Sequence, residues 1–195
     1  MANKVSLILL AALSLVLRSS LGTAGQYQGM VVDADTGQPI DGAAVVIVWY
    51  KETCLAFPGD AAEHLHAVKE TVTDSAGRFT VSAWRGIDWN PSTHVKTPLI
   101  IVYKPGYAAL MPDSLLDRGF RTFEDVERQL RHGARIRLPK LRPECELGRG
   151  VVRSVGELTI HHVPEARIPH LVQLISKQRE RCGLSPFKYL PQGEH

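Results

Sequence analysis

The sequence is poor in the features that would point directly to an activity. It has three cysteines and three tryptophans in 195 residues, and its 23 Lys and Arg nearly balance its 20 Asp and Glu. Such a balance gives no electrostatic basis for binding nucleic acid. We find no internal repeat, no low-complexity segment and no Gly-x-Ser-x-Gly motif of a serine hydrolase. The sequence therefore indicates architecture and location more than chemistry, and no cofactor is expected.

One basic stretch, from Arg128 to Arg142, stands out against this balance. It lacks the interleaved aromatic residues of a protein that binds single-stranded nucleic acid. Positive charges spread along the end of a helix and a strand are typical of a solvated face. We therefore predict no nucleic-acid partner.

A single long run of apolar residues with charged flanks lies at the N-terminus. Lys4 precedes the apolar segment Val5–Leu17, and Arg18 and the small-residue stretch Ser19–Gly25 follow it. A charged start, a hydrophobic middle and a small-residue end are the three parts of a secretory signal, and the run is shorter than the roughly 20 residues of a membrane-spanning helix. We predict that residues 1–25 are a signal peptide and that no membrane span remains after its cleavage.

Two cleavage positions stay open. Cleavage after Ala24 or after Gly25 leaves small residues at the positions that the peptidase reads. No cysteine follows Leu21 in this stretch, so the motif for lipid attachment is missing. We expect an exported protein, periplasmic or extracellular.

The three cysteines are Cys54, Cys145 and Cys182. Two of three cysteines are expected to pair in an oxidising compartment. We predict the pair Cys145–Cys182, because both lie in the segment least able to hold itself in place by strand pairing. Cys54 is then a buried free thiol or the site of an intermolecular bridge.

The first half of the chain has the alternation and the turn residues of β-strands. Gln26–Val32 is predicted to be a first strand, and the unbroken apolar run Ala43–Tyr50 is typical of a central strand buried on both faces. Leu99–Lys104 is a further buried strand, closed by Pro105 and Gly106.

Val68–Val81 alternates through two arms joined by Asp74–Gly77, which predicts a β-hairpin with a tight turn. The flanking segments Lys51–Leu65 and Trp84–Pro98 are less regular and contain Gly and Pro. We predict that both are loops, and we place the binding site on them.

The second half of the chain changes to helical spacing. Phe123–His132 is predicted to be a helix with Thr122 as its N-cap, and Ala134–Leu138 a last strand. Glu165–Cys182 is predicted to be an amphipathic helix stopped by Gly183. Strands first and helices after predict a mainly β fold, a β-sandwich with a C-terminal α-helical extension.

Four motifs resemble the carboxypeptidase regulatory-like domain. They are Gly29–Asp33, Thr36–Ala43, Thr73–Phe79 and Tyr103–Tyr107. The resemblance implies a transthyretin-like Greek-key β-sandwich of seven or eight strands over residues 26–110. Residues 111–195 would then be a C-terminal extension whose helices pack on the sandwich.

The resemblance also implies a non-catalytic module, found beside a catalytic domain or a membrane barrel, or alone in exported bacterial proteins. One transthyretin-like branch hydrolyses 5-hydroxyisourate and ends in a Tyr-Arg-Gly-Ser tail, whereas this sequence ends Tyr189–His195 without that motif. Ser75 and Ser82 also lack a recognisable nucleophile motif. We therefore expect a binding or structural module of the bacterial envelope that is not an enzyme.

His64 and His66 are the strongest alternative to that expectation. Residues two apart on a strand point to the same side, so both imidazoles could bind one metal ion. A third ligand would have to come from Asp60, Glu63 or His94, and no spacing rule selects one. The alternative is an envelope metal-binding protein or hydrolase; a loop with solvated histidines is the simpler interpretation.

Two further clusters point weakly to metal. His161, His162 and His170 precede or begin the C-terminal helix, but adjacent histidines in extended chain face opposite ways. Three aspartates around the first turn do not fit the calcium-loop pattern and are interpreted as turn formers; they are Asp33, Asp35 and Asp41.

Trp84 and Trp89 lie in a polar segment with Gly and Pro. Large flat side chains in such a loop can anchor a protein or carbohydrate partner. They can equally cap the open end of the sandwich, which we rank first.

Overall fold

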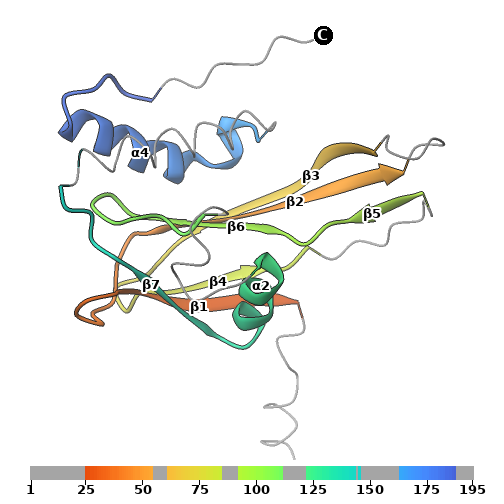
Figure 1. Cartoon of the computed structure of the whole chain (residues 1–195), viewed down its shortest axis with the longest axis horizontal. Coiled ribbons are helices and arrows are strands. Elements are labelled where there is room, and N and C mark those ends of the chain that lie inside the picture. The colour runs from red at the N-terminus through yellow and green to blue at the C-terminus, as the bar shows by residue number, and fades with distance from the viewer. Residues whose placement is uncertain are drawn as a thin grey trace, which may run out of the picture.

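The computed structural model describes residues 25–54, 61–84, 92–111, 122–143, 145 and 163–187. Two β-sheets packed face to face form its centre, and a C-terminal helix lies across the outer side of one of them (Figure 1). The strands are β1 (Gln26–Asp33), β2 (Ala44–Cys54), β3 (Ala61–Val72), β4 (Arg78–Ser82), β5 (Thr93–Val95), β6 (Leu99–Tyr103) and β7 (Ala134–Leu138), and the helices are α2 (Phe123–Arg131), the 3-10 helix η3 (Glu165–Arg167) and α4 (Pro169–Arg181). The predicted mainly β sandwich with a C-terminal helix is confirmed.

The strand order defines the two sheets. Sheet A is β4-β1-β7, in which β4 is antiparallel and β7 parallel to β1. Sheet B has β2 at its centre, with β3 on one side and β6 and β5 in succession on the other. Since β7 follows residue 110, sheet A includes a strand from the second half of the chain.

The inner layer lies between the two sheets. On β2, Val45, Ile47 and Trp49 are buried toward sheet A. They belong to one cluster with residues of β1, β4, β6 and β7, and α2 adds Val126 and Leu130. Side chains that alternate along the strands and point toward the other sheet form this layer.

The outer layer lies on the opposite face of sheet B. Val46 and Val48 alternate with the inward residues of β2 and are buried under α4, which contributes Leu171, Val172 and Ile175. β2 is therefore covered on both faces. This explains its unbroken apolar run, as predicted for a central strand.

The predicted hairpin over Val68–Val81 is wrong, although its turn forms. The first arm belongs to β3 in sheet B and the second to β4 in sheet A. Asp74 Oδ1 accepts hydrogen bonds from the N–H groups of Ala76 and Arg78, at 2.9 and 2.8 Å. Gly77 has a φ of 71°, and a Cβ there would collide with the Val31 carbonyl. The turn therefore connects the two sheets. The prediction failed because alternation in the sequence specifies which face of a strand is buried but not which strand lies beside it.

The two predicted loops also contain strands. β2 continues to Cys54 and β3 starts at Ala61, so much of Lys51–Leu65 is strand. β5 lies within Trp84–Pro98 and pairs with β2. Long-range pairing gives these polar segments a regular structure that their sequence does not indicate.

The helices match the predicted ones with one difference. Thr122 Oγ1 accepts from the N–H of Asp125 at 3.3 Å, which confirms the N-cap of α2. The predicted helix over Glu165–Cys182 is interrupted after η3, and α4 begins at Pro169. Proline disfavours helical backbone in the residue before it, and it suits the first position of a new helix. No helix within the described ranges is long and apolar enough to cross a membrane.

Candidate functional site

The structure brings the two predicted binding segments together at one end of sheet B. The end of β2 pairs with β3 on one side and with β5 on the other, so that Lys51 lies between His64 and Val95. Lys51–Cys54, Ala61–His64 and Thr93–Lys96 are called the distal ribbon below. Figure 1 shows this end of β2, β3 and β5 extending past the strands of sheet A.

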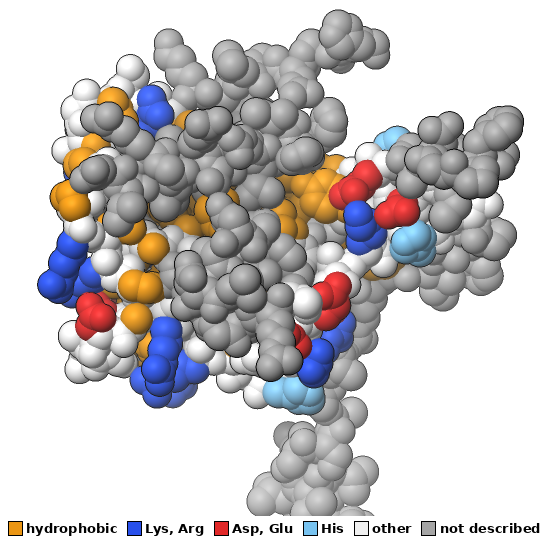
Figure 2. All heavy atoms as spheres, in the orientation of Figure 1, with side chains coloured by type: hydrophobic (Ala, Val, Ile, Leu, Met, Phe, Trp, Pro, Cys, Tyr) orange, Lys and Arg blue, Asp and Glu red, His pale blue; other side chains and the backbone are white. Residues whose placement is uncertain are grey.

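One face of the distal ribbon carries a small ion network. Glu52 lies between Glu63 and His94 in the strand register. Lys96 Nζ is 2.9 Å from Glu63 Oε2 and 3.6 Å from Glu52 Oε2, and this hydrogen bond to Glu63 raises the pKa of Lys96. The ammonium thus bridges two carboxylates that would repel each other across the strands. Figure 2 shows acidic, basic and histidine side chains gathered over this end.

The base of the distal ribbon is marked by a β-bulge. Trp49 pairs with Ala67 and Tyr50 with Leu65, so His66 is the extra residue of β3. Its ring lies edge to face with Trp84, the centroids being 4.3 Å apart at 85°. His66 Nε2 is buried and has no hydrogen-bond partner among the described residues. Bulges of this kind often lie beside binding sites because they redirect a side chain.

The predicted pair His64 and His66 does not gather a third metal ligand. His64 is exposed, and His94 is one register position away and so points to the opposite face. Glu63 is bound to Lys96. No group of three or more metal-ligating side chains occurs in the part of the chain that the structure describes. Asp60, His161 and His162 lie outside that part.

Of the two predicted aromatic anchors, only Trp84 can be placed. It is half buried and packs against the inner layer, in agreement with a residue that caps the end of the sandwich. Trp89 lies outside the described residues.

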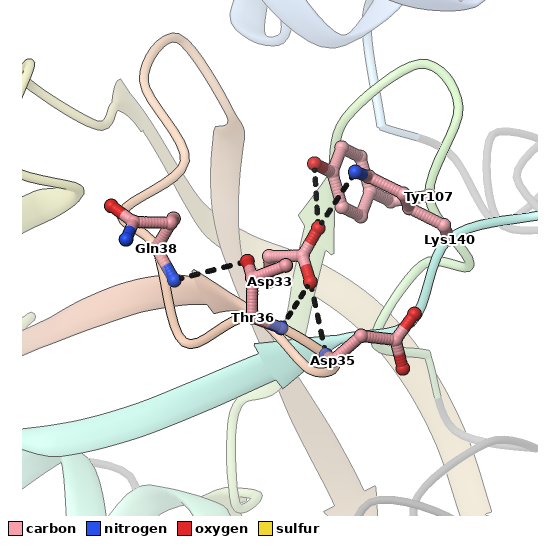
Figure 3. A network of polar contacts seen from close by, with 6 residues as sticks. All are labelled: Asp33, Asp35, Thr36, Gln38, Tyr107 and Lys140. Atoms are coloured by element: carbon pink, nitrogen blue, oxygen red, sulfur yellow. Dashed lines mark hydrogen bonds and ion pairs between the residues drawn. The ribbon is translucent and has the colours of Figure 1, made fainter.

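A second polar cluster surrounds Asp33 (Figure 3). Asp33 Oδ1 accepts from the N–H groups of Asp35 and Thr36, both at 2.9 Å, and Oδ2 accepts from Tyr107 Oη at 3.1 Å and lies 3.2 Å from Lys140 Nζ. The backbone N–H of Thr36 and the Lys140 ammonium hold the pKa of Asp33 well below its usual range. The two hydrogen bonds from N–H groups two and three residues further along the chain are those of a turn-forming aspartate, so the interpretation of Asp33 as a turn former is confirmed.

A serine and a lysine meet outside both clusters. Lys69 Nζ donates to Ser82 Oγ at 2.7 Å, across the open side between β3 and β4. A lysine activates a serine when burial favours its neutral form. This hydrogen bond is exposed, so the geometry supports a surface contact and not a catalytic pair.

The remaining predicted residues lie around α4. Glu70 of β3 accepts from the N–H groups of His170 and Leu171 at 3.0 and 2.7 Å, and it also lies 3.0 Å from His170 Nδ1. At the other end of α4, Cys182 is joined to Cys145 with a Cα separation of 5.4 Å. These residues fasten the helix and leave His170 engaged with a carboxylate.

Sequence reasoning missed the bridge formed by Lys96 and the cap supplied by Glu70. Both depend on residues 33 or more positions apart along the chain, so no local pattern marks them. Comparisons with family models, with curated proteins and with solved structures found no match.

Proposed function

We infer that this chain is an exported, non-catalytic binding module of the bacterial envelope that holds a protein or carbohydrate partner at its distal ribbon. The observation that carries the proposal is the convergence of Lys51–Cys54 and Thr93–Val95 in one projecting set of strands. Both faces of β2 are buried in the sandwich behind the distal ribbon, so the sandwich can serve as a rigid support.

The side chains of the distal ribbon suit a polar partner. Lys96, Glu52, Glu63 and His94 offer donors and acceptors on one face. Trp84 packs part of its ring against the inner layer, and the part that stays accessible beside His66 supplies an amphipathic surface of the kind that commonly anchors a partner. Export is supported by the N-terminal segment, and the module class by the motif resemblance.

The binding proposal is tested with residues 26–195 and two probe sets, an array of envelope oligosaccharides and purified envelope proteins. Any probe that binds is titrated in solution against Trp84→Ala, Lys96→Ala and a distant control, Arg167→Gln on η3. Trp84→Ala is expected to weaken binding at least about ten-fold, as for a buried aromatic anchor. Binding that is equal in all variants, or no binding to either set, contradicts the proposal.

The metal alternative needs a separate measurement. Protein purified without chelator is analysed for its elements beside the His64→Ala/His66→Ala double variant. We expect no stoichiometric zinc or copper and an unchanged fold in the double variant. Stoichiometric metal that disappears in the double variant would replace the binding module by a metal site.

A further inference from the structure

The outer face of sheet A, which the proposed function does not use, carries mainly polar side chains. In both strand pairs the directly opposed residues share a face. Val32, the register partner of Arg137, lies on this face but is buried, and the other residues of the face are exposed or half-buried. The members of this surface, called the sheet-A face, are Gln26, Gln28, Met30, Arg78, Thr80, Ser82, Arg135 and Arg137.

Two arginines on the sheet-A face flank Met30. Arg78 of β4 and Arg135 of β7 are each the register partner of Met30, from opposite sides. Since neighbouring strands are ~4.8 Å apart, the two Cα atoms are separated by ~10 Å. Both side chains are exposed.

The positive charge of these two arginines is not neutralised within the described structure. Arg135 donates to the Gly37 carbonyl, a neutral acceptor, at 3.1 Å. No ion pair of Arg78 with a described carboxylate occurs. None of the eight residues of the sheet-A face is acidic. Asp35 and Asp74 lie in the turns at one end, and Asp74 already accepts two backbone hydrogen bonds.

The basic stretch Arg128–Arg142 therefore divides into two kinds of arginine. On α2, Arg128 and Arg131 are paired with Asp125 and Glu127, at 3.0 and 2.6 Å. On β7, Arg135 donates to a carbonyl group and forms no ion pair with a described carboxylate. Arg78 lies on the same face, on the other side of Met30. The fold thus concentrates unbalanced charge on one face.

We propose that the sheet-A face binds an acidic polysaccharide whose charge is carried by carboxylates. Guanidinium groups bind carboxylates through two parallel hydrogen bonds. Gln28, Thr80 and the other amide and hydroxyl groups in the neighbouring rows match the hydroxyl groups of sugar rings. Among the eight residues of the sheet-A face none is aromatic and Met30 alone is apolar, so the face offers little apolar surface for insertion into a bilayer.

Polygalacturonate is the probe, titrated into residues 26–195 at low and high salt with dextran as the neutral control. The double variant Arg78→Gln/Arg135→Gln is expected to lose binding at least about ten-fold, because two charge-assisted contacts are removed. The control Arg167→Gln/Lys177→Gln removes the same charge from η3 and α4 and is expected to change binding less than about two-fold. High salt is expected to weaken the wild type.

Met30→Glu adds a second, independent variant. A carboxylate between Arg78 and Arg135 offsets one of the two positive charges and competes with the ligand for both guanidinium groups, so binding falls. Thermal unfolding checks that each variant is folded. Equal losses in both double variants, no binding of polygalacturonate, or equally tight binding of polyglutamate or of anionic vesicles would overturn the proposal.

Discussion

The two faces of sheet B are covered in different ways. On the inner face, a second sheet and α2 interlock with it through alternating side chains. On the outer face, one helix, α4, meets the sheet through side chains, with Glu70 at one end of the helix. The Cys145–Cys182 link fastens the other end. The comparison teaches that apolar packing is common to both layers and that each helix is also held by polar contacts, since in the inner layer Tyr27 Oη of β1 donates to Glu127 Oε1 of α2 at 2.8 Å. The outer layer differs in that its helix is also fastened covalently.

The turn after β6 connects the two layers. The Gly106 N–H donates to Gln178 Oε1 of α4 at 3.2 Å, and the neighbouring Tyr107 hydroxyl donates to Asp33 Oδ2 at 3.1 Å. Tyr103 Oη also donates to Gln178, at 2.8 Å. Adjacent residues of one turn therefore hold the helix on one side and the end of β1 on the other.

The strongest test of the comparison uses matched isoleucines. Ile47 of the inner layer and Ile175 of the outer layer are both fully buried. Ile47→Ala and Ile175→Ala are each expected to lower the free energy of unfolding by about 2–5 kcal/mol, measured in urea. Only Ile175→Ala should open α4 selectively in hydrogen exchange, because the inner layer stays intact. Equal exchange profiles would contradict the division into two layers.

A smaller effect is expected at the polar contact of the outer layer. Gln178→Leu leaves the Tyr103 hydroxyl and the Gly106 N–H without their shared acceptor. The expected loss is about 1–3 kcal/mol, the cost of removing the acceptor of two donors at a buried position.

Adding Tyr103→Phe to Gln178→Leu should recover part of that loss, since one donor disappears with its acceptor. A double variant whose loss is the sum of the two single losses would show that the contact is not coupled.

At the N-terminus of α4, Glu70→Gln is expected to cost about 1 kcal/mol. Glu70 supplies the cap because Ile168, in the N-cap position, makes no side-chain hydrogen bond to the helix. The amides of His170 and Leu171 should exchange faster. Glu180→Gln, near the C-terminus of the same helix, is the control and should not speed these amides. Unchanged exchange of these two amides in Glu70→Gln would contradict the assignment of Glu70 as the cap of α4.

A last effect is expected only at acid pH, where the stability of the folded protein depends on Asp33. Its pKa is lowered in the folded protein, so its contribution is present above the unfolded value of about 3.9 and is lost as the pH falls below it. Asp33→Asn should therefore flatten the dependence of the unfolding free energy on pH below about 4. The same slope in the wild type and the variant would contradict this assignment. Asp35→Asn, in the exposed part of the turn, is the control.

Much of the candidate site was accessible to sequence reasoning, but not its shape. The segments around His64 and Trp84 were predicted as the binding regions, yet as separate loops. Their union depends on pairing between Lys51–Thr53 and Thr93–Val95, which are about 40 residues apart and have no alternation strong enough to reveal it. The bulge at His66 is also a property of the paired strands and not of either one alone.

The sequence by itself determined the features that depend on interactions between residues close together in the chain. Alternation marked β7, and a continuous apolar run marked β6. The N-cap at Thr122 and the C-terminal stop at Gly183 marked helix ends, and the turn Asp74–Gly77 formed as predicted. Backbone geometry and hydrogen bonds within a few residues are sufficient for these features.

Only the tertiary structure decided which elements became neighbours. It placed β4 beside β1 instead of β3, gave α4 its cap from Glu70, and left Arg78 and Arg135 on one face. Such choices depend on the total burial and hydrogen bonding of the whole chain, to which distant residues contribute as much as near ones.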